Sequence, residues 1–420
     1  MFEKGSGAPR AEIVVVGNEV TSGLIEERNA RYLGLRLDSA GFDVLRVTSV
    51  GDAKEEIADA VRQAMDRVDW IILTGGLGGT HDDLTKPVLA NLFSSGLRRD
   101  EEVYAHLERW TLARGRAMTG VIRSQSDVPE KAEILFNDRG TAPGLLFREG
   151  NKRVYALPGV PLEMEYLFEK YIFPELSRPG GVRIVHLLLN TTGVSESDLW
   201  TRFGSVSPLE EWCRVASLPS HLGVRIRLSA VGSTESDARG KLNRAREMLE
   251  AVIGTWVYGY DQETLEEVVG GMLRKKRRKV AVAESCTGGL VAHRLTQVSG
   301  SSEYFDEGMI TYSNQAKEER LGVPRDLLMQ HGAVSREVAM AMAEGIRKAA
   351  GADYGVSTTG IAGPTGGSPE KPVGLTFIAV ADANGTECAR HVFYHDRIFN
   401  KERAAQAALN LLRMRLFGSE

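Results

Sequence analysis

Short apolar runs alternate with segments of helical periodicity along the first third of the chain. The runs Ile13–Val16, Asp43–Val50 and Trp70–Thr74 have the length and composition of strands. Between them, apolar residues recur at helical spacing, first over residues 25–40 and then over residues 57–68. The apolar positions are Ile25, Leu33, Leu37 and Ala40, and then Ile57, Ala60, Val61, Ala64, Met65 and Val68. This alternation predicts an α/β fold with a parallel, doubly wound sheet that helices cover on both faces.

The pattern changes twice further along the chain, which predicts three domains. Strands within Ala132–Leu157 and a helix over Pro161–Leu176 complete a first domain, residues 1–176. The turn-rich segment Ser177–Gly181 breaks the pattern and opens a second domain, residues 177–260. Residues 261–420 resume the strand–helix alternation and form a third domain, also of the α/β class.

The second and third domains have recognisable elements of their own. The second domain is predicted to run in the order strand, helix, strand, helix, strand. Its clearest elements are the strands Arg183–Thr191 and Val224–Val231 and the helix Ser236–Ile253. This is a small α+β unit without a cluster of catalytic residue types. The third begins with a helix over Thr264–Arg278 and a strand over Lys279–Ala283.

Composition narrows the classes of function. The 420 residues carry 52 basic and 56 acidic side chains, a net charge of −4 at pH 7, whereas a protein that binds nucleic acid over its whole surface is normally basic. No apolar run approaches the ~18 residues that cross a bilayer, and no signal-peptide core opens the chain. The widely spaced Cys213, Cys286 and Cys388 make neither a metal pair nor a disulfide framework. We expect a cytoplasmic enzyme that does not bind membranes.

One basic run is a possible exception to the expectation that the chain does not bind nucleic acid. Arg274–Lys279 are six consecutive basic residues at the end of a predicted helix. They would suit DNA or an acidic partner, but cations also stabilise the C-terminus of an ordinary solvated helix. With an acidic chain overall, the second interpretation is preferred and nucleic acid is not an expected partner.

A glycine-rich segment follows the third strand of the first domain. Ligands of doubly wound sheets bind beyond the carboxyl ends of strands, and glycine N–H groups there approach phosphate oxygens. Asp82 and Asp83 could hold a divalent cation over those phosphates, or could simply be the N-cap and first-turn residues of the next helix. The segment reads Gly75-Gly76-Leu77-Gly78-Gly79-Thr80-His81-Asp82-Asp83-Leu84-Thr85.

Three further loops in this domain consist of small or polar residues. Gly17-Asn18-Glu19 adds an acid after the first strand, while residues 140–144 (GTAPG) and 157–161 (LPGVP) have the composition of turns. Each is an ordinary turn when taken alone. Together with the glycine-rich segment they predict a nucleotide-sized cleft.

The sharpest cluster of reactive residue types lies in the third domain. Its first strand runs into Glu284-Ser285-Cys286-Thr287-Gly288-Gly289 and then a helix over Leu290–Val298. A Ser at such a turn is suited to nucleophilic attack or anion binding, although Ser285 or Thr287 could instead be the N-cap of the helix. Cys286 is a weaker candidate, because a reactive thiolate needs a His or strong cation and the motif has no His.

Two more segments of this domain complete the candidate chemistry. Residues 310–317 (ITYSNQAK) contain Lys317, which would become a base if burial lowered its pKa, and Tyr312, which could donate or relay a proton. Residues 357–364 (STTGIAGP) follow another strand and are a second candidate for holding phosphate.

These motifs resemble the CinA (competence/damage-inducible) family over essentially the whole chain. TGGLGGTHDDLT, GTAPG and LPGVPLEM are similar to its N-terminal domain, and AESCTGG, GSSEYF, TYSNQAK, GAVS, TGIAGPTGG and KPVG to its C-terminal domain. The resemblance implies a molybdopterin-binding (MogA/MoaB-like) fold, a KH-like middle domain and a C-terminal nicotinamide mononucleotide amidase. It also implies metal-dependent ADP-ribose pyrophosphatase activity in the N-terminal domain, and a homodimer.

The chemistry of the motifs, taken together with the resemblance, assigns residues to each site. In the C-terminal site Ser285 would attack the carboxamide, with Lys317 as the base and Tyr312 assisting, and no metal or cofactor is implied. N–H groups around Thr287–Gly289 would stabilise the oxyanion, and the loop Thr359–Gly363 would hold the ribose phosphate. The substrate-binding set is Thr287, Gly288, Gly289, Asn314, Thr359, Gly360 and Gly363.

In the N-terminal site, Asp82, Asp83 and Glu19 would hold Mg²⁺ or a similar divalent cation over ADP-ribose. The nucleotide-binding set is Asn18, Gly75, Gly76, Gly78, Thr80, Thr141, Pro143, Gly144, Pro158 and Gly159. One residue departs from the family pattern: Gly79 stands where the family usually has Pro, so the φ angle is not fixed and the loop is expected to be looser.

Two other functions remain open from the sequence. The N-terminal domain could bind a pterin or nucleotide without hydrolysing it, as a molybdenum-cofactor protein would. Alternatively, the chain could act in competence through protein or DNA contacts made by its basic run.

Overall fold

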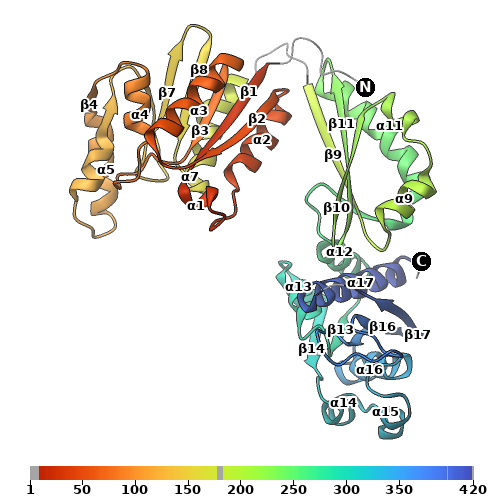
Figure 1. Ribbon diagram of the computed structural model, residues 1–420. Helices are drawn as coiled ribbons and strands as arrows, with labels where there is room; N and C mark the ends of the chain where they lie inside the picture. The colour runs from red at the N-terminus through yellow and green to blue at the C-terminus, as the bar shows by residue number, and fades with distance from the viewer. Residues whose placement is uncertain (1–8, 177–182, 395, 419–420) are drawn as a thin grey trace. The chain divides into compact units, whose positions relative to one another are not determined.

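The computed structural model describes residues 9–176, 183–394 and 396–418. The chain forms two compact units (Figure 1). The first contains a six-stranded sheet, and the second contains a five-stranded sheet together with most of a four-stranded sheet. The expected α/β class is confirmed. The predicted break at Ser177–Gly181 lies outside the described residues. None of the helices in the described ranges has the length and apolar character needed to cross a bilayer.

The six-stranded sheet has the order β2-β1-β3-β8-β7-β6. β2, β1, β3 and β8 are parallel, but β7 and β6 pair antiparallel, so the sheet is mixed and not all-parallel as predicted. The predicted strands Asp43–Val50 and Trp70–Thr74 match β2 and β3. The strands are β1 (Arg10–Val16), β2 (Asp43–Val50), β3 (Trp70–Thr74), β6 (Glu133–Leu135), β7 (Gly144–Glu149) and β8 (Lys152–Leu157), with a separate pair, β4 (Leu97–Arg99) and β5 (Asp127–Pro129).

Helices cover both faces of this sheet because alternate strand residues point to opposite sides. Ile13 and Ile72 pack with α2 and α7 on one face, whereas Val14 and Ile71 pack with α3 and α4 on the other. The prediction that Ile25 belongs to the apolar face of α2 is wrong, because Ile25 is exposed and precedes this helix. The helices are α1 (Asn18–Thr21), α2 (Asn29–Ser39), α3 (Lys54–Arg67), α4 (Thr85–Leu92), α5 (Glu101–Leu112), α6 (Gly120–Arg123), α7 (Pro161–Leu167), a π-helical turn (Phe168–Ile172) and α8 (Phe173–Leu176).

The topology gathers four candidate loops at one edge of the sheet. The parallel strands β1, β3 and β8 end at Val16, Thr74 and Leu157, which are followed by the three loops singled out from the sequence. β7 runs the opposite way and begins at Gly144, so the loop before it lies at the same edge.

The four-stranded sheet has the order β10-β11-β9-β12. The predicted order missed β10, an edge strand whose Pro219 and serines give it no strand-like pattern, and edge strands tolerate Pro. The elements are β9 (Arg183–Thr191), α9 (Glu196–Phe203), α10 (Ser207–Glu210), β10 (Arg214–Ser220), β11 (Gly223–Gly232), α11 (Glu235–Ile253) and β12 (Val257–Tyr260).

The five-stranded sheet has the order β14-β13-β15-β16-β17, in which the first three strands are parallel and the last two antiparallel. Helices α12, α13 and α17 cover one face and α14, α15 and α16 the other. The elements are α12 (Leu265–Lys276), β13 (Val280–Glu284), α13 (Leu290–Gln297), β14 (Phe305–Ile310), α14 (Asn314–Leu321), α15 (Arg325–His331), α16 (Arg336–Ala350), β15 (Tyr354–Gly360), β16 (Leu375–Asp382), β17 (Gly385–Val392) and α17 (Arg397–Phe417).

The basic run belongs to the end of α12, as the second interpretation expected. Arg277 is the C-cap in the left-handed region, with φ 52°. Arg278 pairs with Asp353 at 2.7 Å and Lys279 with Asp306 at 2.9 Å, so carboxylates of the same domain already neutralise part of the run.

Candidate active site

The turn after β13 is shaped by a buried carboxylate. Glu284 is almost completely buried, and its carboxylate accepts N–H bonds from Gly289 (3.0 Å), Val291 (3.1 Å) and Ala292 (2.8 Å). An anion at a helix N-terminus satisfies orphan N–H groups and interacts favourably with the helix dipole. Gly288 and Gly289 have φ angles of 62° and 95°, a region that favours glycine, which explains this dipeptide in the turn.

This capping corrects two expectations. The N-cap of α13 is Gly289, so neither Ser285 nor Thr287 caps the helix. The hydroxyl of Thr287 instead shares a 2.6 Å hydrogen bond with the hydroxyl of Thr358. Because the Gly289 N–H already donates to Glu284, the predicted oxyanion donors narrow to the N–H groups of Thr287 and Gly288.

Ser285 is held between the end of β13 and the neighbouring strand β15. Its N–H donates to the carbonyl of Thr358 at 2.9 Å. Its Oγ accepts a hydrogen bond from Lys317 Nζ at 3.3 Å, and both side chains are largely buried. The structure thus brings together the two residues that the sequence assigned as nucleophile and base.

Lys317 is buried without a carboxylate partner in the described structure. It lies in the first turn of α14, whose N-cap Ser313 accepts the N–H of Ala316. Its Nζ donates to the carbonyls of Thr311 (2.8 Å) and Tyr312 (3.2 Å). Burial lowers the pKa of Lys317 to about 8, because the charged form loses its hydration. A neutral amine, the form that accepts a proton, is therefore accessible near neutral pH.

The neighbouring thiol is not activated. Burial raises the pKa of Cys286 to about 12, so the thiol stays protonated at physiological pH. This agrees with the prediction that Cys286 is a weaker candidate for the nucleophile than Ser285.

Tyr312 takes a different place from the one expected. Its side chain is 60% exposed, and its hydroxyl accepts a 3.2 Å hydrogen bond from Arg397 Nη2. The part of Tyr312 that contacts Lys317 is the backbone carbonyl. Among the described hydrogen bonds, none joins the phenol to Ser285 or Lys317, so direct proton relay has no support in this geometry.

The end of β15 and the loop after it are fixed by hydrogen bonds to the α15–α16 loop and to α17. Thr359 donates its hydroxyl to the Ala333 carbonyl at 2.7 Å, so this predicted substrate ligand already has a partner. On the other side, Asn400 Nδ2 donates to the Ala362 carbonyl (3.0 Å) and Arg397 Nη1 to the Gly363 carbonyl (2.9 Å). Gly360 is the last residue of β15 and Gly363 lies in the loop after it, while Asn314 is exposed in the first turn of α14.

Two cations at this site were missed by the sequence analysis. Arg397 links Tyr312 to Gly363, and Lys401 Nζ lies 3.6 Å from the position that a Cβ on Gly288 would occupy. Both belong to the first turns of α17, far downstream of Ser285 in the chain. No local motif marks them, because only the packing of α17 against the five-stranded sheet brings them to the turn.

The glycine-rich loop of the N-terminal unit is stabilised from within. Gly75 and Gly76 have φ angles of 108° and 65°, and a Cβ on Gly75 would lie 2.1 Å from the Val16 carbonyl oxygen. The Asp83 carboxylate accepts the N–H groups of Gly78 (2.9 Å) and Thr80 (2.8 Å). Asp83 therefore holds the loop, and these two N–H groups already have an anionic partner.

The three acids predicted to bind a metal do not form a ligand set by themselves. Among the described residues there is no group of three or more His, Cys, Asp or Glu side chains arranged to hold a metal ion. Asp82 is exposed and accepts the Thr80 hydroxyl, a bond that lowers the pKa of its carboxyl. Glu19 folds back against Gly17, and Asn18 pairs with Asp52.

The remaining loops at this edge are joined by two buried asparagines. Asn29 Nδ2 donates to the Thr74 hydroxyl and the Gly159 carbonyl, both at 2.8 Å, which ties the ends of β3 and β8 together. Asn137 Nδ2 donates to the Ala142 carbonyl at 2.8 Å and so fixes the loop that contains Thr141, Pro143 and Gly144. Pro158 accepts the Thr74 hydroxyl through its carbonyl.

Gly79 has a packing role that the sequence did not reveal. A Cβ at this position would lie 2.3 Å from the backbone oxygen of Val121 and 2.9 Å from Val121 Cγ1. The absence of a side chain thus lets α6 pack directly against the glycine-rich loop, and does not simply loosen it.

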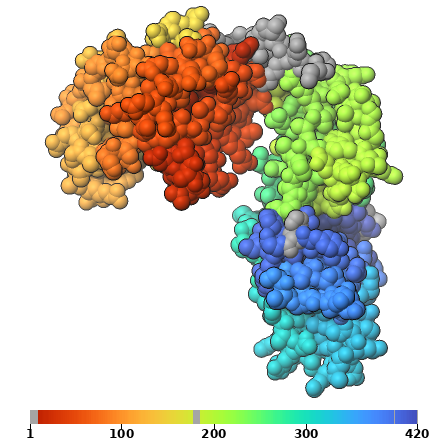
Figure 2. All heavy atoms as spheres, in the orientation of Figure 1, coloured from red at the N-terminus to blue at the C-terminus, as the bar shows by residue number. Residues whose placement is uncertain are grey.

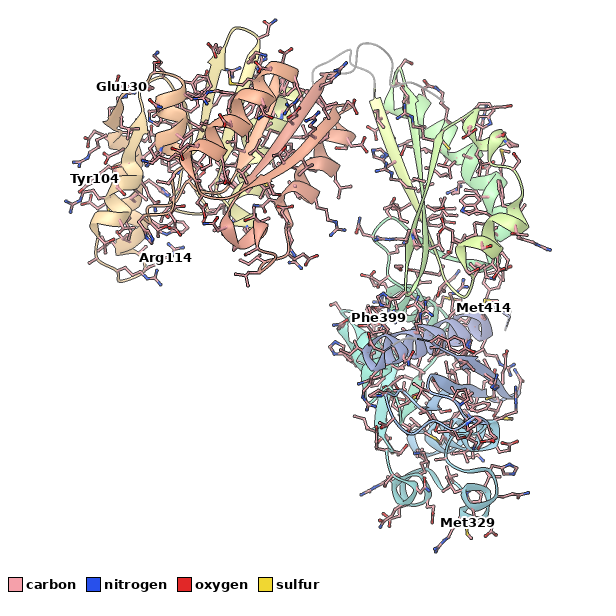
Figure 3. The ribbon with its side chains drawn as sticks, viewed as in Figure 1. Tyr104, Arg114, Glu130, Met329, Phe399 and Met414 are labelled. Carbon is pink, nitrogen blue, oxygen red and sulfur yellow. The ribbon has the colours of Figure 1, made fainter. Side chains whose placement is uncertain are left out.

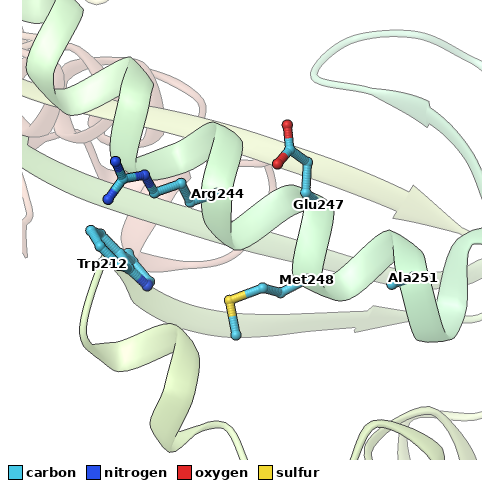
Figure 4. Close-up of a pocket in the computed structure, with 5 residues that line it drawn as sticks. All are labelled: Trp212, Arg244, Glu247, Met248 and Ala251. Carbon is cyan, nitrogen blue, oxygen red and sulfur yellow. The ribbon is translucent and has the colours of Figure 1, made fainter.

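A separate pocket of about 500 Å³ lies on the four-stranded domain (Figure 4). Arg244 stacks over the Trp212 ring at 4.5 Å from its centroid, with Glu247, Met248 and Ala251 along the same side of α11. None of its lining residues belongs to the Ser285–Lys317 group.

Comparisons with known proteins agree in their domain order. Residues 262–416 match the family model "CinA C-terminal domain", residues 12–178 "Probable molybdopterin binding domain" and residues 186–259 "Damage-inducible protein CinA KH domain". The chain is 42% identical over 403 residues, 96% of this chain and 98% of the relative, to a protein of Caldicellulosiruptor saccharolyticus named for competence-damage induction. It is 39% identical over 413 residues to a CinA-like protein of Chloroherpeton thalassium, covering 96% of this chain and 98% of the relative.

Two solved structures are similar to part of this chain. The crystal structure of the competence/damage inducible protein CihA from Agrobacterium tumefaciens is 39% identical and covers 36% of this chain and 93% of its own, with a TM-score of 0.36. That of CinA from Thermoplasma acidophilum is 35% identical and covers 40% of this chain and 98% of its own, with a TM-score of 0.38.

Proposed function

Because the chain belongs to the CinA family, we propose that it is a bifunctional enzyme of pyridine-nucleotide salvage. The C-terminal domain hydrolyses nicotinamide mononucleotide to nicotinate mononucleotide and ammonia. The N-terminal domain cleaves the diphosphate of ADP-ribose with a divalent cation. The observation that carries the amidase proposal is the 3.3 Å hydrogen bond between the buried Lys317 amine and the Ser285 hydroxyl.

The amidase step uses Lys317 first as a base and then as an acid. The neutral amine accepts the Ser285 proton as Oγ attacks the carboxamide carbon, and the N–H groups of Thr287 and Gly288 stabilise the oxyanion. When the tetrahedral intermediate collapses, the C–N bond breaks and the Lys317 ammonium gives its proton to the leaving ammonia. Water then attacks the Ser285 ester, Lys317 takes the water's proton and returns one to Ser285, and the acid is released.

The cations of α17 give a basis for recognising a mononucleotide. Arg397 lies beside Gly363 in the loop after β15, and Lys401 lies beside Gly288 in the turn after β13. A phosphate between them would therefore contact two positive charges. The proposed role of the loop Thr359–Gly363 is to fix the far end of the substrate, with Arg397 as its charged group.

The N-terminal proposal rests on fewer contacts. Mg²⁺ is commonly held by one or two carboxylates together with substrate phosphates, and Asp82 is the exposed carboxylate beside the glycine-rich loop. Such an ion would neutralise charge on the diphosphate. We propose Asp82 as its protein ligand, with Asp83 serving the loop.

A binding function without hydrolysis remains the second candidate for this domain. It is favoured by one observation: among the described residues, no group of three or more His, Cys, Asp or Glu side chains is arranged to hold the metal ion that hydrolysis would use.

Direct assays test both activities. The full-length protein is expected to release ammonia from nicotinamide mononucleotide in the presence of EDTA. With Mg²⁺ it is expected to cleave ADP-ribose, and chelation or Asp82→Asn should abolish that cleavage while sparing ammonia release. Nucleotide binding without any cleavage of ADP-ribose would favour the second candidate, and absence of ammonia release would refute the amidase.

A further inference from the structure

Helix α17 contacts the KH domain along one face. Phe399 and Met414, labelled in Figure 3, lie near the two ends of this helix. The residues that face the KH domain are spaced by three and four positions, so they form one continuous stripe. They are Phe399, Glu402, Arg403, Gln406, Asn410 and Arg413.

The contacts at the N-terminal end of the stripe converge on one residue. His221 occupies the turn between β10 and β11. Its Nε2 lies 2.6 Å from Glu402 Oε2, its carbonyl accepts Arg403 Nε at 3.0 Å, and its ring meets Phe399 edge-on at 4.8 Å between centroids. Figure 2 shows the blue C-terminal residues directly against the green KH domain.

The C-terminal end of the stripe is anchored separately. Arg413 is nearly buried and donates to the carbonyls of Val257 (2.9 Å) and Thr255 (2.8 Å), while Gln406 donates to Thr192 at 3.1 Å. Loss of the His221 contacts would therefore free only the first turns of α17, where helices fray most readily.

Those first turns also carry the groups that reach the amidase site. Arg397, Asn400 and Lys401 are interleaved with Phe399, Glu402 and Arg403, on an adjoining face of the same two turns. A shift of this segment relative to the five-stranded sheet would move Arg397 from Gly363 and Lys401 from Gly288.

We propose that His221 is a positioning residue for the amidase site: through Phe399, Glu402 and Arg403, the KH domain fixes the first turns of α17 and so holds Arg397 and Lys401 where they bind the substrate's phosphate. The inference rests on the proposed amidase function. It gives the KH domain a role in substrate affinity, with the chemistry left to Ser285 and Lys317.

The test uses the full-length protein and four forms of it: wild type, His221→Ala, His221→Gln and the control Asn410→Ala, which alters the same stripe about two turns further on. His221→Ala removes the side-chain contacts with Glu402 and Phe399 but keeps the backbone carbonyl to which Arg403 donates. It should raise KM for nicotinamide mononucleotide about tenfold, the scale of one lost charge-assisted contact, with kcat within about twofold. His221→Gln, which keeps a polar side chain beside Glu402, should recover part of the affinity. Asn410→Ala should leave both constants unchanged.

Hydrogen exchange provides a readout that does not depend on the activity. His221→Ala should speed amide exchange in residues 397–402 and leave residues 405–413 as in wild type. Unchanged exchange and unchanged KM, or a fall in kcat at constant KM, would overturn the inference. If wild type releases no ammonia, the proposed function fails, while the exchange result still decides whether His221 holds α17.

Discussion

Lys317 Nζ lies 3.3 Å from Ser285 Oγ, and the same amine donates to the carbonyls of Thr311 and Tyr312. The two carbonyls hold the amine in place without neutralising it, because neither carries a full charge. Burial then decides its protonation and lowers the pKa of Lys317 to about 8. This combination places an amine of lowered pKa beside the Ser285 hydroxyl, as the proposed mechanism requires of its base.

The first prediction is the pH dependence of ammonia release. Since Lys317 must be neutral to accept the Ser285 proton, kcat/KM should rise about tenfold per pH unit below pH 8 and level off above it. A rise that continues past pH 9 would mean that the pKa of Lys317 is not lowered. Lys317→Arg, which stays protonated throughout, should be inactive across the whole range.

The second prediction concerns Cys286. Burial keeps this thiol protonated, with a pKa of about 12, so iodoacetamide should neither label Cys286 in the folded protein nor inhibit ammonia release. Cys286→Ala should lower kcat by less than about tenfold. Mass spectrometry of the peptide that contains Cys286 would check the labelling, and rapid inactivation that coincides with its modification would move the nucleophile from Ser285 to this thiol.

The third prediction concerns the residue that departs from the family pattern. Gly79→Pro or Gly79→Ala places a Cβ 2.3 Å from the Val121 oxygen, so α6 or the loop must move, at a cost of about 1–3 kcal/mol for an overpacked site. Thermal unfolding should show a lower Tm. The matched control is Gly120→Ala, where no atom lies within 4 Å of the added Cβ and φ is outside the left-handed region. A Gly79→Pro protein as stable as wild type would show that the contact with Val121 is not tight.

Much of the architecture could be predicted from periodicity. The apolar residues of buried strands such as Trp70–Thr74, and the apolar face of the amphipathic helix α3, indicate which positions are buried. The choice of Ser285 and Lys317 as candidate site residues was also possible from the sequence. Each lies in a motif of unusual composition, and both motifs resemble those of a known family. The strand β10 could not be predicted, because it lies at the edge of its sheet and has no fully buried residues that would give an alternating apolar pattern.

What could not be predicted depends on which groups meet in three dimensions. Arg397 and Lys401 reach the turn after β13 only through the packing of α17. Glu284 accepts the N–H of Gly289, one of the donors predicted for a substrate anion, and Asp83 accepts the N–H of Gly78 in the glycine-rich loop. In both loops a neighbouring carboxylate competes with a substrate anion for the backbone N–H groups. The spacing of residues in the sequence does not show which of the two accepts these hydrogen bonds.

The most direct test of the account is the rate of ammonia release from nicotinamide mononucleotide by Ser285→Ala, Lys317→Ala and the double variant. Because the two residues act as one unit, each single variant should lower kcat by at least about a thousandfold, and the double variant should be little worse than either. Circular dichroism of each variant confirms that it is folded. A nearly active Ser285→Ala, or losses that multiply in the double variant, would contradict the mechanism.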